Sequence, residues 1–424
     1  MMIVLVCNSE TGFYDWDTDQ YWAIAQSLNE NGEFAYYNGN EVYYIHSRLP
    51  GYPIFITPFQ NGSLNLSILI IFQCILGALT SSITFKIACL FGLRKRYAFL
   101  AGLITAFHFP SIIFSCLVMS ETLFAFLFVC STYFWLQGLI NNNRKSIMLG
   151  ALILGLSIYV RPVSLYLPFV LPFASLFFMK SWKDKVAASL IVISIPLLVI
   201  SPWIIRNKMV FDKVFVSTNG DFNLLYFRAA GAMCEAEGIS LDQAIAQLKS
   251  SFEKEFGKEQ LTRPIEAQRV RRQIAINYIL ENKWALIKST SKSLIRFSIY
   301  PIRATVDHQI GHDQYVYSIN QFGKEYSTSV AKRLTASSSK ITIALMFYQI
   351  IWSILIWVGF LLSILYGSNR KSKIYWIGVF ILAYFAVVSA GPESGGRLLI
   401  PIAGILSVLS VLGWKQILNK RSFF

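Results

Sequence analysis

Nine long apolar segments constrain the fold of this 424-residue chain more than any other feature. An α-helix needs about 20 apolar residues to cross the hydrocarbon core of a bilayer. Only 14% of the residues are charged, against about 25% in soluble proteins, which is too few to solvate a soluble surface of this size. The sequence therefore predicts an all-α polytopic membrane protein. The segments cover roughly residues 64–91, 97–118, 121–140, 146–160, 163–179, 186–205, 341–366, 374–391 and 397–414.

The distribution of charge predicts which side of the membrane each connection occupies. The net charge of +15 would also suit a nucleic-acid-binding protein, but nearly all of the excess lies in every second connection. These basic connections hold 14 Lys or Arg and one acid, a net charge of +13. Because cytoplasmic loops of membrane proteins are enriched in Lys and Arg, this side is predicted to be cytoplasmic, and no nucleic-acid partner is expected. The basic connections are residues 94–96, 144–145, 180–185, 370–373 and 415–421.

The alternation predicts one membrane domain, 1–424, with two insertions on the outer side. Residues 8–62 form the first outer loop, and residues 206–340 form a large outer loop that we expect to be mostly helical. Six transmembrane helices are expected in 64–205 and three in 341–414, followed by a cytoplasmic tail, 415–424. The seven apolar residues at the start would cover only about 10 Å as a helix. We therefore expect the natural protein to have a further span before Met1.

Helix signals recur within both outer insertions. The segment from Tyr21 predicts a surface helix that ends at Gly32. Residues 240–257 and about 264–299 each read as one helix, and Ser240 with Gln243 resembles a capping box. The second of these helices is basic. Two interpretations stay open for it, a solvated face packed on the membrane domain or a surface that contacts anionic lipid or the acceptor.

Acidic residues at the outer face are the candidates for acid–base chemistry. Asp15, Asp17 and Asp19 form the densest acidic cluster there, and Glu121 opens a predicted span directly after Ser120. A carboxylate in such a place can remove a proton from a hydroxyl group. Capping of a helix, or favourable contact with its dipole, would explain the same residues structurally.

Arginines on the same side are the candidates for binding an anion. Arg48 precedes Leu49-Pro50-Gly51-Tyr52-Pro53, which predicts a fixed turn rather than a helix. Arg161 follows an apolar run of only fourteen residues, so it is expected below the outer surface, where it needs an anionic partner. Arg206 and Arg397 also lie on the outer side, against the positive-inside bias. Guanidinium groups gathered there would suit a phosphate.

With these acidic and basic residues in this order, the sequence resembles the GT-C glycosyltransferases. The resemblance is to the dolichyl-phosphate-mannose protein mannosyltransferase and lipid A aminoarabinose transferase family in particular (glycosyltransferase families 39 and 83). The resemblance implies that residues 1–424 form a single GT-C-like helical bundle in the membrane. It also implies a catalytic Asp in the first outer loop, which corresponds to Asp17, and inversion at the transferred sugar. Many members have an acidic residue directly after that Asp, whereas this chain has Thr18, with Asp19 one position later. The resemblance rests on Asp17-x-x-x-Tyr21-x-x-x-Ala25, Arg48-Leu49-Pro50-Gly51-Tyr52-Pro53, Ser120-Glu121-Thr122-Leu123-Phe124, Arg161-Pro162, Pro202-Trp203-x-x-Arg206-Asn207 and Glu393-x-x-x-Arg397.

The expected activity is transfer of a hexosyl or pentosyl group from a polyprenyl-phosphate-linked donor to a glycolipid, glycan or protein acceptor. We expect it at the extracytoplasmic face of a bacterial inner (plasma) membrane, with the bilayer as a further partner. Asp17 would be the base, and Asp19 and Glu121 secondary acidic residues. If a divalent cation takes part, Asp17 and Asp19 are its expected ligands. The residues expected to bind the donor are Arg48, Tyr52, Arg161, Arg206 and Arg397.

Two other functions stay open from the sequence. A flippase or transporter for lipid-linked sugars would need ionisable residues at mid-membrane and broken helices in matching halves. His108-Phe109-Pro110 is the best candidate for such a break, and the two halves do not match. A surface-polysaccharide polymerase or ligase with a large outer loop is the other alternative, and only the acidic first loop argues against it.

Overall fold

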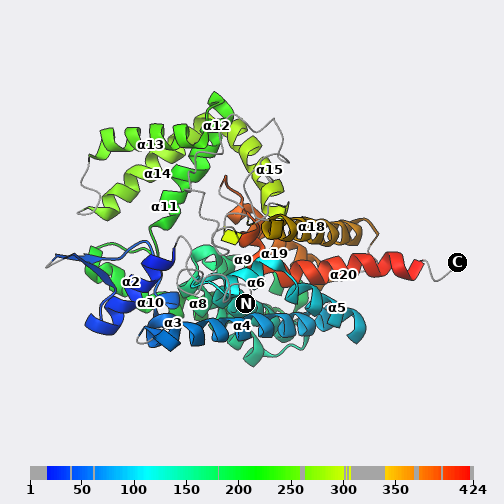
Figure 1. The fold of residues 1–424 in the computed structure, drawn as a ribbon. Coiled ribbons are helices and arrows are strands. Elements are labelled where there is room, and N and C mark those ends of the chain that lie inside the picture. The colour runs from blue at the N-terminus through cyan, green and yellow to red at the C-terminus, as the bar shows by residue number, and fades with distance from the viewer. Residues whose placement is uncertain are drawn as a thin grey trace.

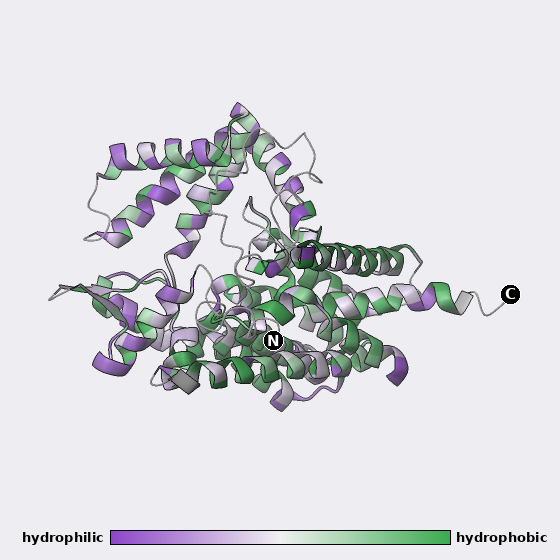
Figure 2. Cartoon of the chain, viewed as in Figure 1, coloured by the Kyte–Doolittle hydropathy of each residue, from purple (hydrophilic) through white to green (hydrophobic). Residues whose placement is uncertain are grey.

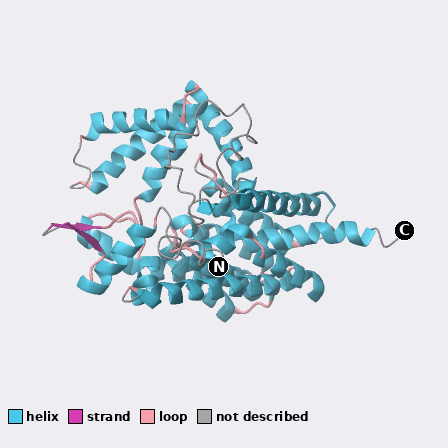
Figure 3. Ribbon diagram, in the orientation of Figure 1, coloured by secondary structure: helices cyan, strands magenta, loops and turns pink. Residues whose placement is uncertain are grey.

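The structure is a computed structural model, and helices make up most of what it describes (Figure 3). The apolar helices lie together in one bundle, and the helices of the large insertion, α11 to α15 (residues 219–299), form an arch beside it (Figure 1). The described residues are 17–38, 41–60, 63–179, 181–257, 263–299, 302, 305–306, 340–366, 372–392 and 395–420.

The first predicted outer loop contains a helix, a hairpin and a second helix. Helix α2, Thr18–Asn31, ends at Gly32 as predicted, because Gly32 takes the left-handed conformation (φ 70°) that glycine adopts without strain. Strands β1, Ala35–Asn38, and β2, Glu41–Tyr44, pair antiparallel, with Asn38 opposite Glu41. These elements lie at the end of the bundle opposite the C-terminus (Figure 1).

Five described helices are long and apolar enough to cross a membrane: Leu66–Leu90, Glu121–Ile140, Trp182–Phe211, Lys340–Tyr366 and Gly396–Leu418. They lie within α4, Ser63–Leu90; α7, Glu121–Ile140; α10, Trp182–Phe211; α18, Lys340–Tyr366; and the 3-10 helix η6, Gly396–Ile402, with α20, Ala403–Lys420.

The remaining four predicted spans are shorter or broken. Within the predicted span 97–118, helices α5, Lys95–Ala106, and α6, Phe109–Ser115, are bent by 55° next to His108-Phe109-Pro110, the best candidate for a break in the sequence. Pro110 explains the break, since a proline has no N–H to donate and its ring clashes with the preceding turn. Helix α9, Leu167–Phe178, has 12 residues and rises about 18 Å. Helices α8, Arg144–Val160, and α19, Lys373–Ser389, have 17 residues each, so nine crossings stay a prediction.

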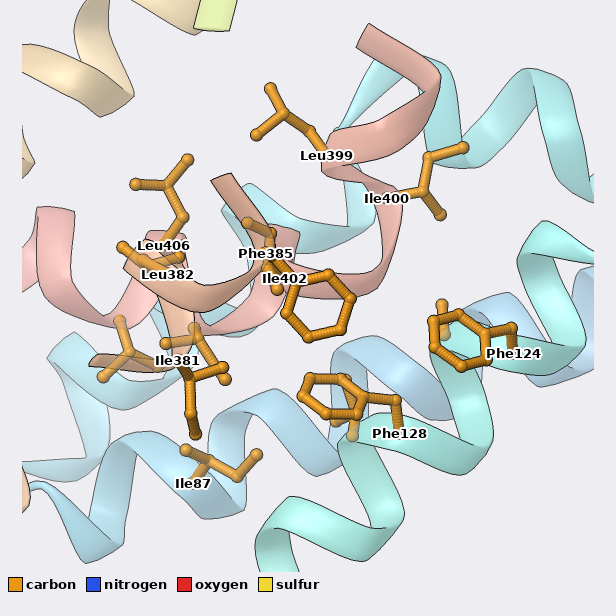
Figure 4. Packing of buried hydrophobic residues seen from close by; sticks show 14 of the residues in the cluster. Ile87, Phe124, Phe128, Ile381, Leu382, Phe385, Leu399, Ile400, Ile402 and Leu406 are labelled. Atoms are coloured by element: carbon orange, nitrogen blue, oxygen red, sulfur yellow. The ribbon is translucent and has the colours of Figure 1, made fainter. Parts of the chain in front are cut away.

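Aromatic and aliphatic side chains fill the centre of the bundle. Phe124 and Phe128 of α7 point toward Phe385 of α19, and the ring centroids of Phe128 and Phe385 are 4.9 Å apart (Figure 4). Helices α18 and α20 approach so closely that a Cβ atom on Gly413 would overlap the carbonyl of Gly359. Small residues at such crossings are typical of membrane helices.

The insertion predicted to lie on the outer side has its own small core. Its helices are α11, Asn219–Asn223; the π-helix η3, Leu224–Ala229; α12, Ala230–Glu237; α13, Leu241–Phe256; α14, Pro264–Glu281; and α15, Lys283–Ile299. Leu225, Leu248 and Phe252 belong to a buried cluster separate from that of the bundle. Hydrophilic residues line α13 and α14, in contrast to the apolar bundle (Figure 2).

One prediction for this insertion is confirmed and another is wrong. Ser240 and Gln243 form the predicted capping box at the start of α13. The single helix predicted for 264–299 is interrupted at Asn282, where the backbone leaves the helical region (φ −117°, ψ 43°).

Chemical labelling can test the predicted sidedness. In a cysteine-depleted background, Ser250→Cys on exposed α13 is expected to react with a membrane-impermeant maleimide in intact cells. Lys145→Cys, in a basic connection, is expected to react only after permeabilisation. The reverse pattern of labelling would contradict the assignment of sides.

Candidate functional site

Helix α2 is held against one end of the bundle by hydrogen bonds on both sides of its first turn. Thr18 Oγ1 donates to the backbone carbonyl of Val118 (3.1 Å), and the hydroxyl groups of Tyr21 and Ser120 share a hydrogen bond of 3.3 Å. Thr18 is fully buried. These contacts place Asp17, the residue that precedes the helix, next to the start of α7.

The proline segment is positioned just as tightly, although it is not the turn that was predicted. It begins helix α3, Gly51–Ile56, because Pro53 lies in the first helical turn, where a backbone N–H would have no partner in any case. Gly51 packs against α8 so closely that a Cβ atom would lie 2.7 Å from the carbonyl of Tyr159. Arg48 therefore projects from a segment with little freedom to move.

Five charged side chains from distant parts of the sequence meet at this end of the bundle. Arg48 Nη2 lies 2.5 Å from Asp17 Oδ1, and Arg397 Nη2 lies 3.4 Å from Asp17 Oδ2. Glu121 Oε1 lies 2.5 Å from Arg161 Nη1 and 3.1 Å from Arg397 Nε. Arg397 thus joins two carboxylate–guanidinium pairs into one group. We call these five residues the charge cluster.

Local backbone structure explains why these side chains reach one another. Arg161 ends α8 in an extended conformation (φ −144°, ψ 131°), since Pro162 disfavours a helical residue before it. Glu121 is the first residue of α7, where the helix dipole favours a negative charge. Arg397 lies in the first turn of η6.

One side of the charge cluster is buried, and the other side is partly exposed to solvent. The Glu121 side chain is 1% exposed, whereas that of Arg397 is 32% exposed. Neither Glu121 oxygen accepts a hydrogen bond of good geometry from a described residue, so its ion pairs compensate for its burial. Three guanidinium groups against two carboxylates leave one formal positive charge. Each guanidinium group can bind an anion through two parallel hydrogen bonds.

The electrostatic environment of Asp17 keeps this carboxyl ionised. Burial by itself would raise its pKa, but the guanidinium groups of Arg397, Arg48 and Arg161 outweigh this effect and hold the pKa below the ordinary value of 3.8. Asp17 is therefore a carboxylate at neutral pH, able to accept a proton.

The remaining predicted residues lie outside the charge cluster. Asp19 is exposed on α2, and the buried Tyr52 donates its hydroxyl proton to Gln73 Oε1 (2.8 Å). Arg206 donates to the backbone carbonyls of Ile45 and Phe34, each at 3.0 Å. These contacts hold the base of the β1–β2 hairpin. Asp15, and Glu393 of the motif Glu393-x-x-x-Arg397, lie outside the described residues.

Two neutral residues with buried or cluster-bound hydrogen bonds were not identified from the sequence, Gln20 and Gln73. Gln20 Oε1 accepts a hydrogen bond from Arg48 Nε (2.8 Å). Gln73 is fully buried in α4, and its Nε2 donates to the carbonyl of Leu117 (2.7 Å). A glutamine inside an apolar run is a visible signal, because a polar group there needs a partner. Nothing in the pattern around Gln20 marks it.

The possible divalent cation finds little support in this arrangement. Both carboxylate oxygens of Asp17 face guanidinium groups, which would repel a cation. Asp19 is exposed on α2, and within the described ranges no group of three His, Cys, Asp or Glu side chains is placed to hold a metal ion. The described residues therefore do not fit a cation here.

Comparison with known proteins identifies a family match for part of the chain. Residues 20–212 match the family described as dolichyl-phosphate-mannose-protein mannosyltransferase. This match includes Arg48, Glu121 and Arg161 but neither Asp17 nor Arg397. No curated protein matches the sequence.

Solved structures of membrane glycosyltransferases are similar to the whole chain. The oligosaccharyltransferase AglB from Archaeoglobus fulgidus, in complex with an inhibitory peptide and a dolichol-phosphate, superposes with a TM-score of 0.53 at 14% identity, covering 100% of this chain and 50% of that one. The same organism's enzyme tethered to an acceptor peptide gives a TM-score of 0.52 at 13% identity, with coverages of 100% and 49%. ArnT from Cupriavidus metallidurans bound to undecaprenyl phosphate gives 0.40 at 12% identity, with coverages of 99% and 76%.

The two likenesses to the oligosaccharyltransferase, each with a TM-score above 0.5, confirm the predicted fold class. At 13–14% identity they show a shared fold, and this chain spans about half the length of the oligosaccharyltransferase. The chain is an integral membrane protein with the GT-C fold, and its residues 20–212 match the dolichyl-phosphate-mannose-protein mannosyltransferase family.

Proposed function

We propose that this protein transfers a sugar from a polyprenyl-phosphate carrier to an acceptor hydroxyl or amide at the outer face of the membrane. The observation that carries the proposal is the charge cluster, in which Asp17 lies between Arg48 and Arg397 at the end of an apolar bundle. The match to a family described by its dolichyl-phosphate-mannose donor supports the same chemistry.

The net charge of the cluster suits both ends of this reaction. A sugar-linked polyprenyl phosphate is a phosphodiester with one negative charge, which the single positive charge of the cluster can balance. When the bond between the sugar C1 and the phosphate oxygen breaks, a second negative charge develops on the leaving phosphate. The guanidinium groups of Arg48, Arg161 and Arg397 can offset that charge as it forms.

Asp17 would act as the general base. The acceptor oxygen or nitrogen attacks C1 from the face opposite the phosphate, its proton passes to an Asp17 carboxylate oxygen, and polyprenyl phosphate departs. A single displacement of this kind inverts the configuration at C1. Glu121, which is fully buried beneath the arginines, would hold Arg161 and Arg397 in position rather than touch the acceptor.

The test is whether the purified protein cleaves the bond between sugar and phosphate. With a panel of polyprenyl-phosphate sugars and candidate acceptors, we expect formation of free polyprenyl phosphate in proportion to glycosylated product. In proteoliposomes, movement of an intact lipid-linked sugar across the bilayer without cleavage would instead support the flippase alternative.

Arg161→Lys tests the proposed contact with the phosphate. Lysine keeps the charge but cannot form the planar, bidentate contact of a guanidinium group. We expect the KM for the donor to rise on the order of tenfold, with thermal stability close to that of the wild type, because the substituted lysine can still pair with Glu121. Wild-type kinetics in this variant would remove Arg161 from the donor site.

The pH dependence of the reaction tests the environment of Asp17. In the free enzyme the arginines lower its pKa, so kcat/KM is expected to stay flat as the pH falls from 7 to about 5. With donor bound, the phosphate competes for the arginines and adds a negative charge, and both effects raise the pKa of Asp17. The acid limb of kcat should therefore lie at higher pH than that of kcat/KM. Coincident limbs would contradict this arrangement.

A further inference from the structure

The segment that leads from α19 toward Arg397 is held by the large outer insertion. Arg228, in the π-helix η3, donates from Nη2 to the backbone carbonyls of Val387 (3.1 Å) and Val388 (2.8 Å). These carbonyls belong to the last turn of α19, where no helical N–H reaches them. A cation at this end of a helix also interacts favourably with the helix dipole.

Helices α12 and α15 hold the next part of the same segment. Arg296 Nη1 of α15 donates to the carbonyl of Pro392 (3.3 Å). A Cβ atom on Gly231 of α12 would lie 2.5 Å from Pro392 Cγ and 2.6 Å from Ser289 Oγ of α15. Pro392 is buried in this contact, which leaves no space for a side chain at position 231.

The held segment ends shortly before the charge cluster. Arg397 follows Pro392 by five positions and lies in the first turn of η6, which also packs against α15. Its guanidinium is the only described group that contacts both Asp17 and Glu121, at 3.4 and 3.1 Å. A shift of η6 by an ångström or two would therefore separate the two ion pairs that Arg397 joins.

We propose that the outer insertion positions Arg397 through residues 387–392, with Arg228, Gly231 and Arg296 as positioning residues. A π-helix is rare and is often found near functional sites, which agrees with the place of Arg228 in η3. The link from Arg397 to the donor rests on the proposed function, whereas the mechanical link from the insertion to η6 does not.

Hydrogen exchange tests the mechanical link without any ligand. Gly231→Ala must displace Pro392, and we expect faster exchange at the amides of residues 396–400 in the intact protein. Gly220→Ala is the matched control, since Gly220 lies in a helix of the same insertion with no atom within 4 Å of the added Cβ. Wild-type exchange at 396–400 in Gly231→Ala would overturn the proposal.

Binding of undecaprenyl phosphate tests the link to the donor. We expect Gly231→Ala and Arg228→Ala each to raise its Kd on the order of tenfold, the effect of losing one charged hydrogen bond. Arg269→Ala, an exposed arginine on α14, should leave the Kd unchanged.

A double-mutant cycle separates positioning from general damage to the fold. In an Arg397→Ala background, the effect of Gly231→Ala on the Kd should disappear, because both changes act through one side chain. Additive effects would refute positioning through Arg397. If exchange at 396–400 rises but the wild type does not bind undecaprenyl phosphate, the proposed function fails while the mechanical link stands.

Discussion

Asp17→Asn is expected to lower turnover by roughly 10²–10⁴, the usual contribution of a general base. Asparagine has the same size and can still accept a hydrogen bond from Arg48, which lies 2.5 Å from Asp17 in the native protein. It cannot take the acceptor's proton. The measurement is kcat with a polyprenyl-phosphate sugar, compared at saturating donor.

Asp19→Asn is the matched control for this variant. Asp19 is two residues away and exposed on α2, so its loss should change turnover little. Binding of undecaprenyl phosphate to the Asp17 variant should persist, because removing one negative charge leaves the positive charge of the arginines to attract the phosphate. An Asp17→Asn enzyme with full turnover would contradict the proposed mechanism, although the fold would be unaffected.

Glu121→Gln is expected to destabilise the protein by on the order of 3 kcal/mol. The glutamine would leave the guanidinium groups of Arg161 and Arg397 without the buried charge that they share at 2.5 and 3.1 Å. Breaking a buried ion pair on one side is costly because the remaining charge stays desolvated. The midpoint of thermal unfolding in detergent measures the effect.

Asp184→Asn provides the comparison for Glu121→Gln. Asp184 pairs with Arg144 at 2.8 Å, but the Arg144 side chain is 57% exposed, so solvent screens this pair and its loss should change stability much less than the loss of Glu121. Equal losses of stability in the two variants would show that burial of Glu121 does not have the effect assigned to it. Partial recovery of Glu121→Gln by undecaprenyl phosphate is also expected, because the phosphate supplies a negative charge to the same arginines.

The sequence allowed much of this fold to be predicted, because its main signals are local. An apolar run or a helix that ends at glycine depends on neighbouring residues only, so α2 and α13 were predicted closely. The β1–β2 hairpin was missed, although Asn38-Gly39 is a sequence signal for a tight turn. The interruption at Asn282 carries no proline or glycine that would have marked it.

The candidate site was predicted residue by residue but not as an arrangement. Asp17 and Arg397 are 380 positions apart, and no periodicity in a sequence places such residues together. The ordered motifs selected them, and the same reasoning selected Arg206, which instead donates to the carbonyls of Ile45 and Phe34. Arg228 and Gly231 were not selected at all, because their roles depend on contacts with Val388 and Pro392 that only the folded chain creates.

The central claim is that the charge cluster binds the phosphate of a polyprenyl carrier. An experimental structure of the protein with undecaprenyl phosphate, and the distances from its phosphate oxygens to the guanidinium groups, test this claim most directly. The account predicts hydrogen-bond distances, about 2.7–2.9 Å, to at least two of Arg48, Arg161 and Arg397. A phosphate bound elsewhere, such as at Arg206 or on the basic helix α15, with the ion pairs of Asp17 and Glu121 intact, would contradict it.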